Sequence, residues 1–91
     1  MVDESYEAVG LKISDEVAEL LESRQIMQDE IKIVINNAET KREKLYQEKA
    51  DRFLAKLRIS QVTFYVEYSL SGENTYVVHS AYSHRTELVE G

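Results

Sequence analysis

The sequence predicts an α+β domain in which a short N-terminal strand and two helices precede a three-stranded antiparallel meander that packs on the helices. Three observations predict this class. Apolar residues recur at helical spacing between Val17 and Ala38, they alternate from Phe53 onward, and polar turn residues separate the alternating runs. Because 91 residues are enough for only one modest core, we expect residues 1–91 to form a single domain with an ordered core at about residues 9–85.

The first predicted element is a short strand that leads directly into a helix. Apolar residues occupy every second position from Val9 to Ile13, which is the period of a strand. Ser14 follows and suits a helix N-cap, because its hydroxyl accepts from the free amides of the next turn. Asp15 and Glu16 then lie where the helix dipole favours negative charge.

The helical region has two interpretations. Its apolar positions form two groups, namely Val17, Leu20 and Leu21, then Ile31, Val34, Ile35 and Ala38. One continuous helix would place Arg24 on the buried stripe and Ile26 off it. Two helices joined around residues 24–28 would let Ile26 and Met27 fill the junction, with Asp29 opening the second helix. We favour the pair, because a single helix of roughly 24 residues is long for this domain.

The strands are predicted to begin after a charged connector. Residues 39–51 contain only Leu45 and Tyr46 as neighbouring anchors, so we expect a frayed helix or a turn there. Beyond this point, β-branched and aromatic residues alternate with polar ones. The predicted strands and turns are strands 53–59, 62–68 and 76–82, a tight hairpin turn at Ser60–Gln61, and a turn at 71–74.

Composition excludes several classes of function. Without cysteine, the chain has no disulfide framework, no thiolate metal site and no cysteine nucleophile. Its three glycines are isolated, so no phosphate-binding loop exists, and no HExxH metal motif occurs. We therefore expect no metal and no cofactor in this chain. The acidic N-terminus and the lack of a long apolar run predict a cytoplasmic protein without a targeting signal or a membrane span.

Charge is distributed unevenly along the sequence. The formal net charge is −6, which argues against general nucleic-acid binding and against anionic membranes. Residues 1–40 carry −7, residues 41–58 carry +4 and residues 59–91 carry −3. The basic stretch either packs beside the acidic helices as mutually screened surface, or forms a local patch for an acidic or phosphate-bearing partner.

Tyrosines on the sheet suggest a partner-binding surface. Tyr65 faces away from Phe64 and Val66 on a strand, so we expect it on the outer side of the sheet. Aromatic side chains give large contact areas at low entropic cost, although ordinary cross-strand pairing would also account for them. The candidate partner-binding residues are Tyr65, Glu67 and His79 on the sheet, and Lys44, Arg52 and Arg58 in the basic stretch.

A second candidate cluster is His79, Tyr82, His84 and Arg85. Histidine and tyrosine transfer protons and arginine holds anions, so a general acid–base site is conceivable. On a straight strand His79 faces away from Tyr82 and His84, while Arg85 returns to the His79 side. This separates the groups, and without a bulge the two histidines cannot hold one metal. The competing interpretation is that Tyr82 packs on the helices and His84 and Arg85 form a polar strand end.

Several segments resemble a known type of domain. They are LLESRQI (20–26), DEIKIVINNAE (29–39), EKLY (43–46), RFLAKLR (52–58), VTFYVEY (62–68) and VVHSAYSHR (77–85). Together they resemble a small uncharacterised domain associated with pyridine-nucleotide, flavin-dependent oxidoreductases that carry iron–sulfur clusters. The resemblance implies an accessory domain or small subunit whose partner protein holds all the cofactors, and it implies no catalytic residue.

The order of elements also resembles the helix–helix–strand–strand–strand toxins of bacterial toxin–antitoxin pairs, some of which are ribosome-dependent endoribonucleases. Those nucleases are strongly basic, unlike this chain. We therefore expect a non-catalytic accessory or protein-interaction domain, and the first resemblance implies that its partner is a flavin- and NAD-linked oxidoreductase. The sequence is also compatible with a homodimer. The alternative is a toxin-like endoribonuclease that uses His79, Tyr82, His84 and Arg85.

Overall fold

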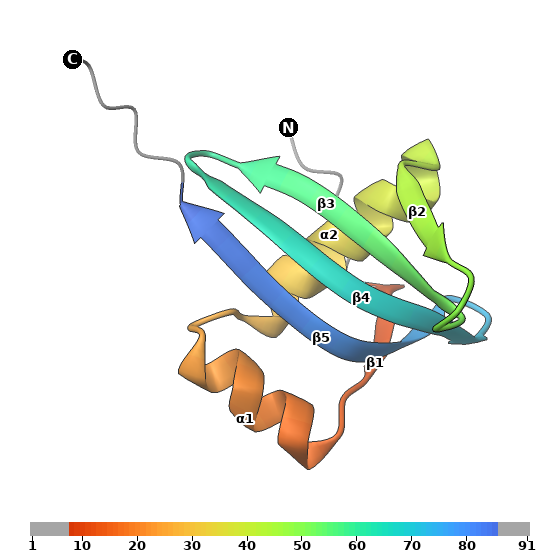
Figure 1. The fold of residues 1–91 in the computed structure, drawn as a ribbon, viewed down its shortest axis with the longest axis horizontal. Helices are drawn as coiled ribbons and strands as arrows, with labels where there is room; N and C mark the ends of the chain where they lie inside the picture. Colours follow the sequence, from red (N-terminus) through yellow and green to blue (C-terminus); the bar gives the residue numbers. More distant parts are fainter. Residues whose placement is uncertain (1–7, 86–91) are drawn as a thin grey trace.

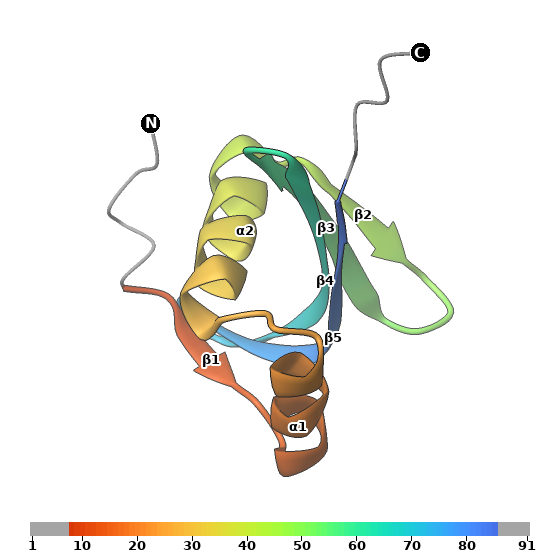
Figure 2. The same cartoon turned by 90° about the vertical axis from the view of Figure 1, so that its left-hand side faces the viewer.

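The computed structural model describes residues 8–85 and shows an α+β fold with two helices and a five-stranded mixed sheet (Figure 1). Its elements in chain order are β1 (Gly10–Lys12), α1 (Asp15–Ser23), α2 (Gln28–Lys41), β2 (Lys44–Gln47), β3 (Arg52–Ile59), β4 (Val62–Gly72) and β5 (Thr75–Arg85). The sheet curves around α2, and α1 lies beside β5 near the edge that β1 forms (Figure 2). Within the described residues no helix has both the length and the apolar character needed to cross a bilayer.

The sheet order is β1-β5-β4-β3-β2. The strands β3, β4 and β5 form the predicted antiparallel meander, and the predicted N-terminal strand is present as β1, paired parallel to β5. The meander is nevertheless only the centre of a larger sheet, because β2 adds an antiparallel strand beside β3. The three-stranded prediction was therefore incomplete.

Part of the connector expected at residues 39–51 is regular structure, because α2 extends through residue 41 and residues 44–47 form β2. Helix α2 runs through Lys41 and ends at Arg42, whose left-handed backbone (φ 57°) turns the chain and whose N–H donates to the Ala38 carbonyl. Residues 44–47 then pair with β3, and the Tyr46 ring packs on Phe53 with ring centroids 5.2 Å apart. Periodicity cannot reveal so short an edge strand, because its two apolar residues are adjacent and do not alternate.

The helical region consists of two helices, as predicted. Ser14 caps α1, accepting from the Val17 N–H at 3.2 Å. Gln25, with φ 58°, reverses the chain after α1, and Ile26 fills the junction with only 6% of its surface exposed. Met27 does not fill the junction: it is 64% exposed, because it serves as the N-cap of α2 and projects from the helix start.

The core lies between α2 and the concave face of the sheet. Helix α2 buries Ile31, Val34, Ile35 and Ala38, the spacing of a single helical stripe. Opposite them, the sheet contributes Ala55, Phe64, Val66, Tyr68, Tyr76, Val78 and Ala81. Burial of these side chains provides the main stabilisation of the fold.

A cluster of polar side chains connects β2 and β4 to the C-terminal end of α2. Tyr68 is fully buried, and its hydroxyl donates to Glu39 Oε2 at 2.5 Å. The Lys44 ammonium pairs with the same carboxylate oxygen and lies 4.3 Å from the centroid of the Phe53 ring. Burial, reinforced by the Glu39 carboxylate, raises the pKa of Tyr68 well above its usual value.

Most of the β5 edge that faces away from β4 is not paired with another described strand. Strand β1 pairs only with residues 75–77, and no other described strand pairs with the remainder of that edge. Arg24 Nη1 donates to the Ala81 carbonyl at 2.7 Å, so the junction between the helices satisfies one edge acceptor. Such side-chain cover makes an edge less available for unwanted strand pairing.

Candidate interaction surface

The convex face of the sheet is covered by neither helix (Figure 2). Alternation along the strands places on it the residues whose neighbours, such as Ala55 and Val66, are buried beneath α2. We call this surface the outer face, and define it as Arg52, Leu54, Lys56 and Arg58 of β3, Tyr65, Glu67 and Ser69 of β4, and His79, Tyr82 and His84 of β5.

A β-bulge at His79 changes which residues of β5 reach the outer face. Val78 opposes Tyr68 and Ser80 opposes Glu67, so His79 is an extra residue with no partner across the strand pair. The alternation shifts by one residue beyond it. Ala81 consequently faces the core, with 1% of its surface exposed.

The bulge corrects three expectations for the histidine cluster. His79, Tyr82 and His84 lie on the same face, whereas a straight strand would have separated His79 from the other two. Tyr82 does not pack on the helices, because Ala81 occupies that side. Arg85 was expected on the His79 side and instead follows Ala81 on the opposite side.

An aromatic pair with a flanking lysine forms one row across the outer face. Lys56, Tyr65 and Tyr82 are direct neighbours on β3, β4 and β5. The two tyrosine rings stack with centroids 4.7 Å apart and planes 13° apart, and Lys56 Nζ lies 5.8 Å from the Tyr65 centroid. Tyr82 remains 42% exposed, so the row presents an aromatic surface to solvent.

Two polar pairs lie farther along the outer face. Arg52 Nη1 is 3.5 Å from Glu67 Oε2, and both side chains are partly exposed. Ser69 Oγ is 2.8 Å from His79 Nε2. Partial burial lowers the pKa of His79, and nearby Arg52 acts in the same direction, so the environment favours the neutral imidazole.

Five of the six predicted partner-binding residues lie on the outer face: Arg52, Arg58, Tyr65, Glu67 and His79. Lys44 does not, because its ammonium turns towards Glu39 on the helix side of the sheet. Arg58 uses Nε to donate to the Ser60 carbonyl at 3.0 Å. The six residues therefore do not form one continuous patch.

The basic and acidic side chains, which are unevenly distributed along the sequence, are also unevenly distributed over the surface. Arg52, Lys56 and Arg58 project from β3 on the outer face, whereas the first turn of α1 carries Asp15 and Glu16. Lys44 with Glu39 is the part of the basic stretch that does pair with a helix. The outer face is thus more basic than the chain as a whole.

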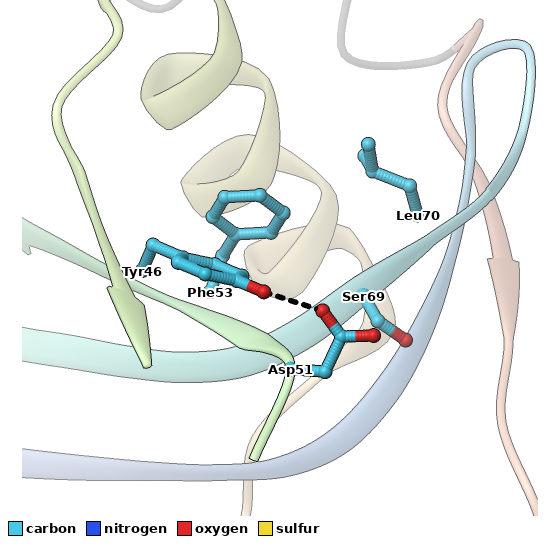
Figure 3. A pocket seen from close by; sticks show the side chains of 5 residues that line it. All are labelled: Tyr46, Asp51, Phe53, Ser69 and Leu70. Carbon is cyan, nitrogen blue, oxygen red and sulfur yellow. Dashed lines mark hydrogen bonds between the residues drawn. The ribbon is translucent and has the colours of Figure 1, made fainter. Parts of the chain in front are cut away.

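Two hollows lie on either side of β2. The hollow on the helix side has a volume of about 490 Å³ and is lined by Tyr46, Asp51, Phe53, Ser69 and Leu70 (Figure 3). The Tyr46 hydroxyl donates to Asp51 Oδ1 at 2.6 Å, which raises the pKa of Tyr46. Tyr46 and Leu70 are 53% and 58% exposed, so this hollow opens widely to solvent.

The second hollow, which we call the outer hollow, has a volume of about 610 Å³. Its lining includes the apolar side chains Leu45, Leu54 and Tyr65, and the charged side chains Arg42, Glu43 and Lys56. Leu45 and Leu54 are direct cross-strand partners, and Leu45 is 69% exposed. This mixture of exposed apolar surface and cations occurs where the row Lys56–Tyr65–Tyr82 reaches the edge of the sheet.

The histidine cluster has the geometry of a surface and not of an enclosed site. Tyr82, His84 and Arg85 are exposed, and His79 is held by Ser69. Among residues 8–85 no three His, Asp or Glu side chains are placed to hold a metal ion.

Arg42, Leu45 and Lys56 were not among the candidate binding residues taken from the sequence. A two-residue turn at Ser60–Gln61 implies that Ile59 opposes Val62, and counting back from that pair places Lys56 beside Tyr65. The position of Lys56 beside Tyr65 could therefore have been predicted from the register of the hairpin. No comparable signal existed for Leu45, because its strand was not predicted.

Comparison with known proteins found no match to any protein family, curated protein or solved structure.

Proposed function

We propose that this chain is a non-catalytic protein-interaction domain that binds its partner through the outer face. The observation that carries the proposal is the exposed row of Lys56, Tyr65 and Tyr82 on a sheet face that neither helix covers. Stacked tyrosines hold a large contact area in a fixed position, so little conformational entropy remains to be lost on binding. Tyrosine and arginine are also enriched at the energetically important positions of protein interfaces.

The partner we propose is a flavin- and NAD-linked oxidoreductase. Support for it comes from the sequence resemblance, over about residues 11–87, to a domain associated with such enzymes. In that arrangement this chain is an accessory subunit, and the flavin, nicotinamide and iron–sulfur chemistry belongs to the partner.

The test is purification of the tagged chain from its native cells, comparing two variants of exposed side chains. Tyr82→Ser removes the exposed half of the aromatic pair, and Met27→Ser removes an exposed apolar side chain on the helix side. We expect one co-purifying protein with flavin absorbance, lost with Tyr82→Ser and kept with Met27→Ser. A partner lost only with Met27→Ser would contradict the proposed surface, and a partner without flavin would contradict the proposed class.

One specific observation favours the endoribonuclease alternative. The bulge places His79, Tyr82 and His84 on one exposed face, which is the arrangement that acid–base chemistry on a bound strand would need. This alternative predicts that the purified protein cleaves ribosome-bound message and that His84→Ala abolishes the cleavage while Ser83→Ala preserves it. Absence of cleavage by the unmodified chain excludes it.

A further inference from the structure

The outer hollow offers apolar surface that the fold itself leaves uncovered. Leu45 lies directly across from Leu54 at the outer edge of the sheet, and the Tyr65 ring lines the same hollow. Leu45 makes so little internal contact that 69% of its surface is exposed. A single apolar side chain of a ligand would bury this surface and gain the corresponding hydrophobic free energy.

Cations without a carboxylate partner among the described residues lie beside this apolar surface. Among the described residues, Lys44 and Arg52 have carboxylate partners, whereas Arg42 and Lys56 make no ion pair. Glu43 contributes one carboxylate to the hollow, and Arg58 adds a further cation two residues beyond Lys56 on the same strand. The local surface therefore favours an anionic ligand, although the chain as a whole carries −6.

The backbone beside the hollow is suited to an extended ligand. Strand β2 pairs with β3 only over residues 52–55, so no described strand pairs with the same edge of β3 from Lys56 to Ile59. An extended segment laid along this edge would hydrogen-bond to the free backbone while its side chains met the hollow. The surface thus combines three determinants: an apolar contact, a positive charge and an open strand edge.

We propose that the outer hollow binds an extended acidic segment of the partner protein, with one apolar side chain on Leu45, Leu54 and Tyr65 and carboxylates beside Lys56 and Arg42. This inference rests on the proposed function and specifies which kind of partner sequence the outer face recognises. A long polyanion such as a nucleic acid fits less well, because it would also meet the net negative charge of the chain and has no equivalent aliphatic anchor.

The test is selection of binding peptides from a phage-displayed library of random 12-residue peptides on the immobilised full chain. Affinities of the selected peptides are then measured by fluorescence polarisation for six proteins: the unmodified chain, Lys56→Glu, Leu45→Ser, Tyr82→Ser, and the matched controls Lys12→Glu and Met27→Ser. Lys12 is an exposed lysine on β1 at the opposite edge of the sheet, and Met27 is as exposed as Leu45. Thermal unfolding of each variant confirms that it is folded.

We expect the selected peptides to carry Asp or Glu around one Leu, Ile or Phe. Lys56→Glu should weaken binding roughly five- to tenfold, because it replaces attraction by repulsion, and Leu45→Ser should weaken it about fivefold. The two controls should change affinity by less than about twofold. Replacing the acidic residues of a selected peptide by their amides should give a loss similar to that of Lys56→Glu.

Other outcomes overturn the inference. Neutral or basic peptides, no enrichment, or equal affinity for Lys56→Glu and the unmodified chain would each contradict it. A concentration-dependent dimer that Leu45→Ser dissociates would show that a second copy of the chain occupies the hollow instead. If the selected peptides respond to Tyr82→Ser but not to Lys56→Glu, the inference fails while the proposed function stands; peptides that ignore both variants contradict both.

Discussion

Substitution of Tyr68 by phenylalanine tests how the polar cluster stabilises the fold. The change removes only the hydroxyl that donates to Glu39 and leaves the buried ring in place. Hydrogen bonds to charged groups contribute about 1.5–3 kcal/mol, and Glu39 keeps its pairing with Lys44, so we expect a loss of about 1.5 kcal/mol in the free energy of unfolding. For a domain of this size that corresponds to a Tm lower by roughly 6–12 °C.

The matched control is Tyr46→Phe, which removes a hydroxyl that donates to Asp51 at the surface. We expect its effect on stability to stay within about 0.5 kcal/mol. Urea and thermal unfolding at pH 7 measure both variants. Equal stabilities for Tyr68→Phe and the unmodified chain would refute the assigned role of the cluster.

The same variant should change the alkaline limb of the stability profile. Tyrosine in the unfolded chain ionises near pH 10, whereas the raised pKa of Tyr68 keeps it protonated in the folded chain. Its contribution is therefore complete below about pH 10 and decreases above it, by about 1.4 kcal/mol per pH unit for one proton. Burial also raises the pKa of Tyr76, so Tyr68→Phe should reduce the alkaline slope without abolishing it. An unchanged slope would contradict this assignment.

Three further substitutions test the remaining elements. Arg24→Ala should lower the free energy of unfolding by about 1 kcal/mol, because the Ala81 carbonyl loses its hydrogen-bond donor. Hydrogen exchange of the backbone amides along the open β5 edge should also become faster. Unchanged exchange would mean that this hydrogen bond does not protect the edge. A double-mutant cycle between Tyr65→Ala and Tyr82→Ala should give a coupling of about 0.5–1.5 kcal/mol, and a coupling near zero would show that the rings do not stack in solution. Ile35→Ala should cost about 2–5 kcal/mol in urea unfolding, whereas a cost below 1 would place α2 away from the sheet.

Local sequence signals were sufficient to predict the two helices and the three central strands of the sheet. Ser14 followed by Asp15 and Glu16 marked the start of α1, and the two apolar groups on either side of residues 24–28 indicated the break between the helices. The turn residues at Ser60–Gln61 correctly separated β3 from β4. These features depend on neighbours within a few positions of each other, which is the range over which periodicity and capping act.

Features that depend on tertiary pairing were missed. Strand β2 exists because Tyr46 packs on Phe53 and Lys44 reaches Glu39, and neither contact has a periodic signature in the sequence. The bulge at His79 arises in the pairing of β5 with β4, and it reverses the facing of Tyr82 relative to a straight strand. An irregularity of one residue is invisible to an argument based on a period of two.

The candidate surface was predictable only in part. Alternation correctly placed Tyr65 and Glu67 on the outer face, because no bulge lies between them on β4. Lys44 was grouped with them from its place in the basic stretch, but β2 directs its ammonium to Glu39. The outer hollow was not predicted, because Leu45 contributes to it from a strand that the sequence did not indicate.

Site-specific photocrosslinking in the native cells tests the central claim most directly. A benzoylphenylalanine at position 82 replaces one exposed aromatic side chain of the outer face by another, and the same group at position 27 samples an exposed site on the helix side. We expect position 82 to crosslink to one specific protein and position 27 not to crosslink to it. Crosslinking of that protein at position 27 alone would contradict the assignment of the outer face as the interaction surface.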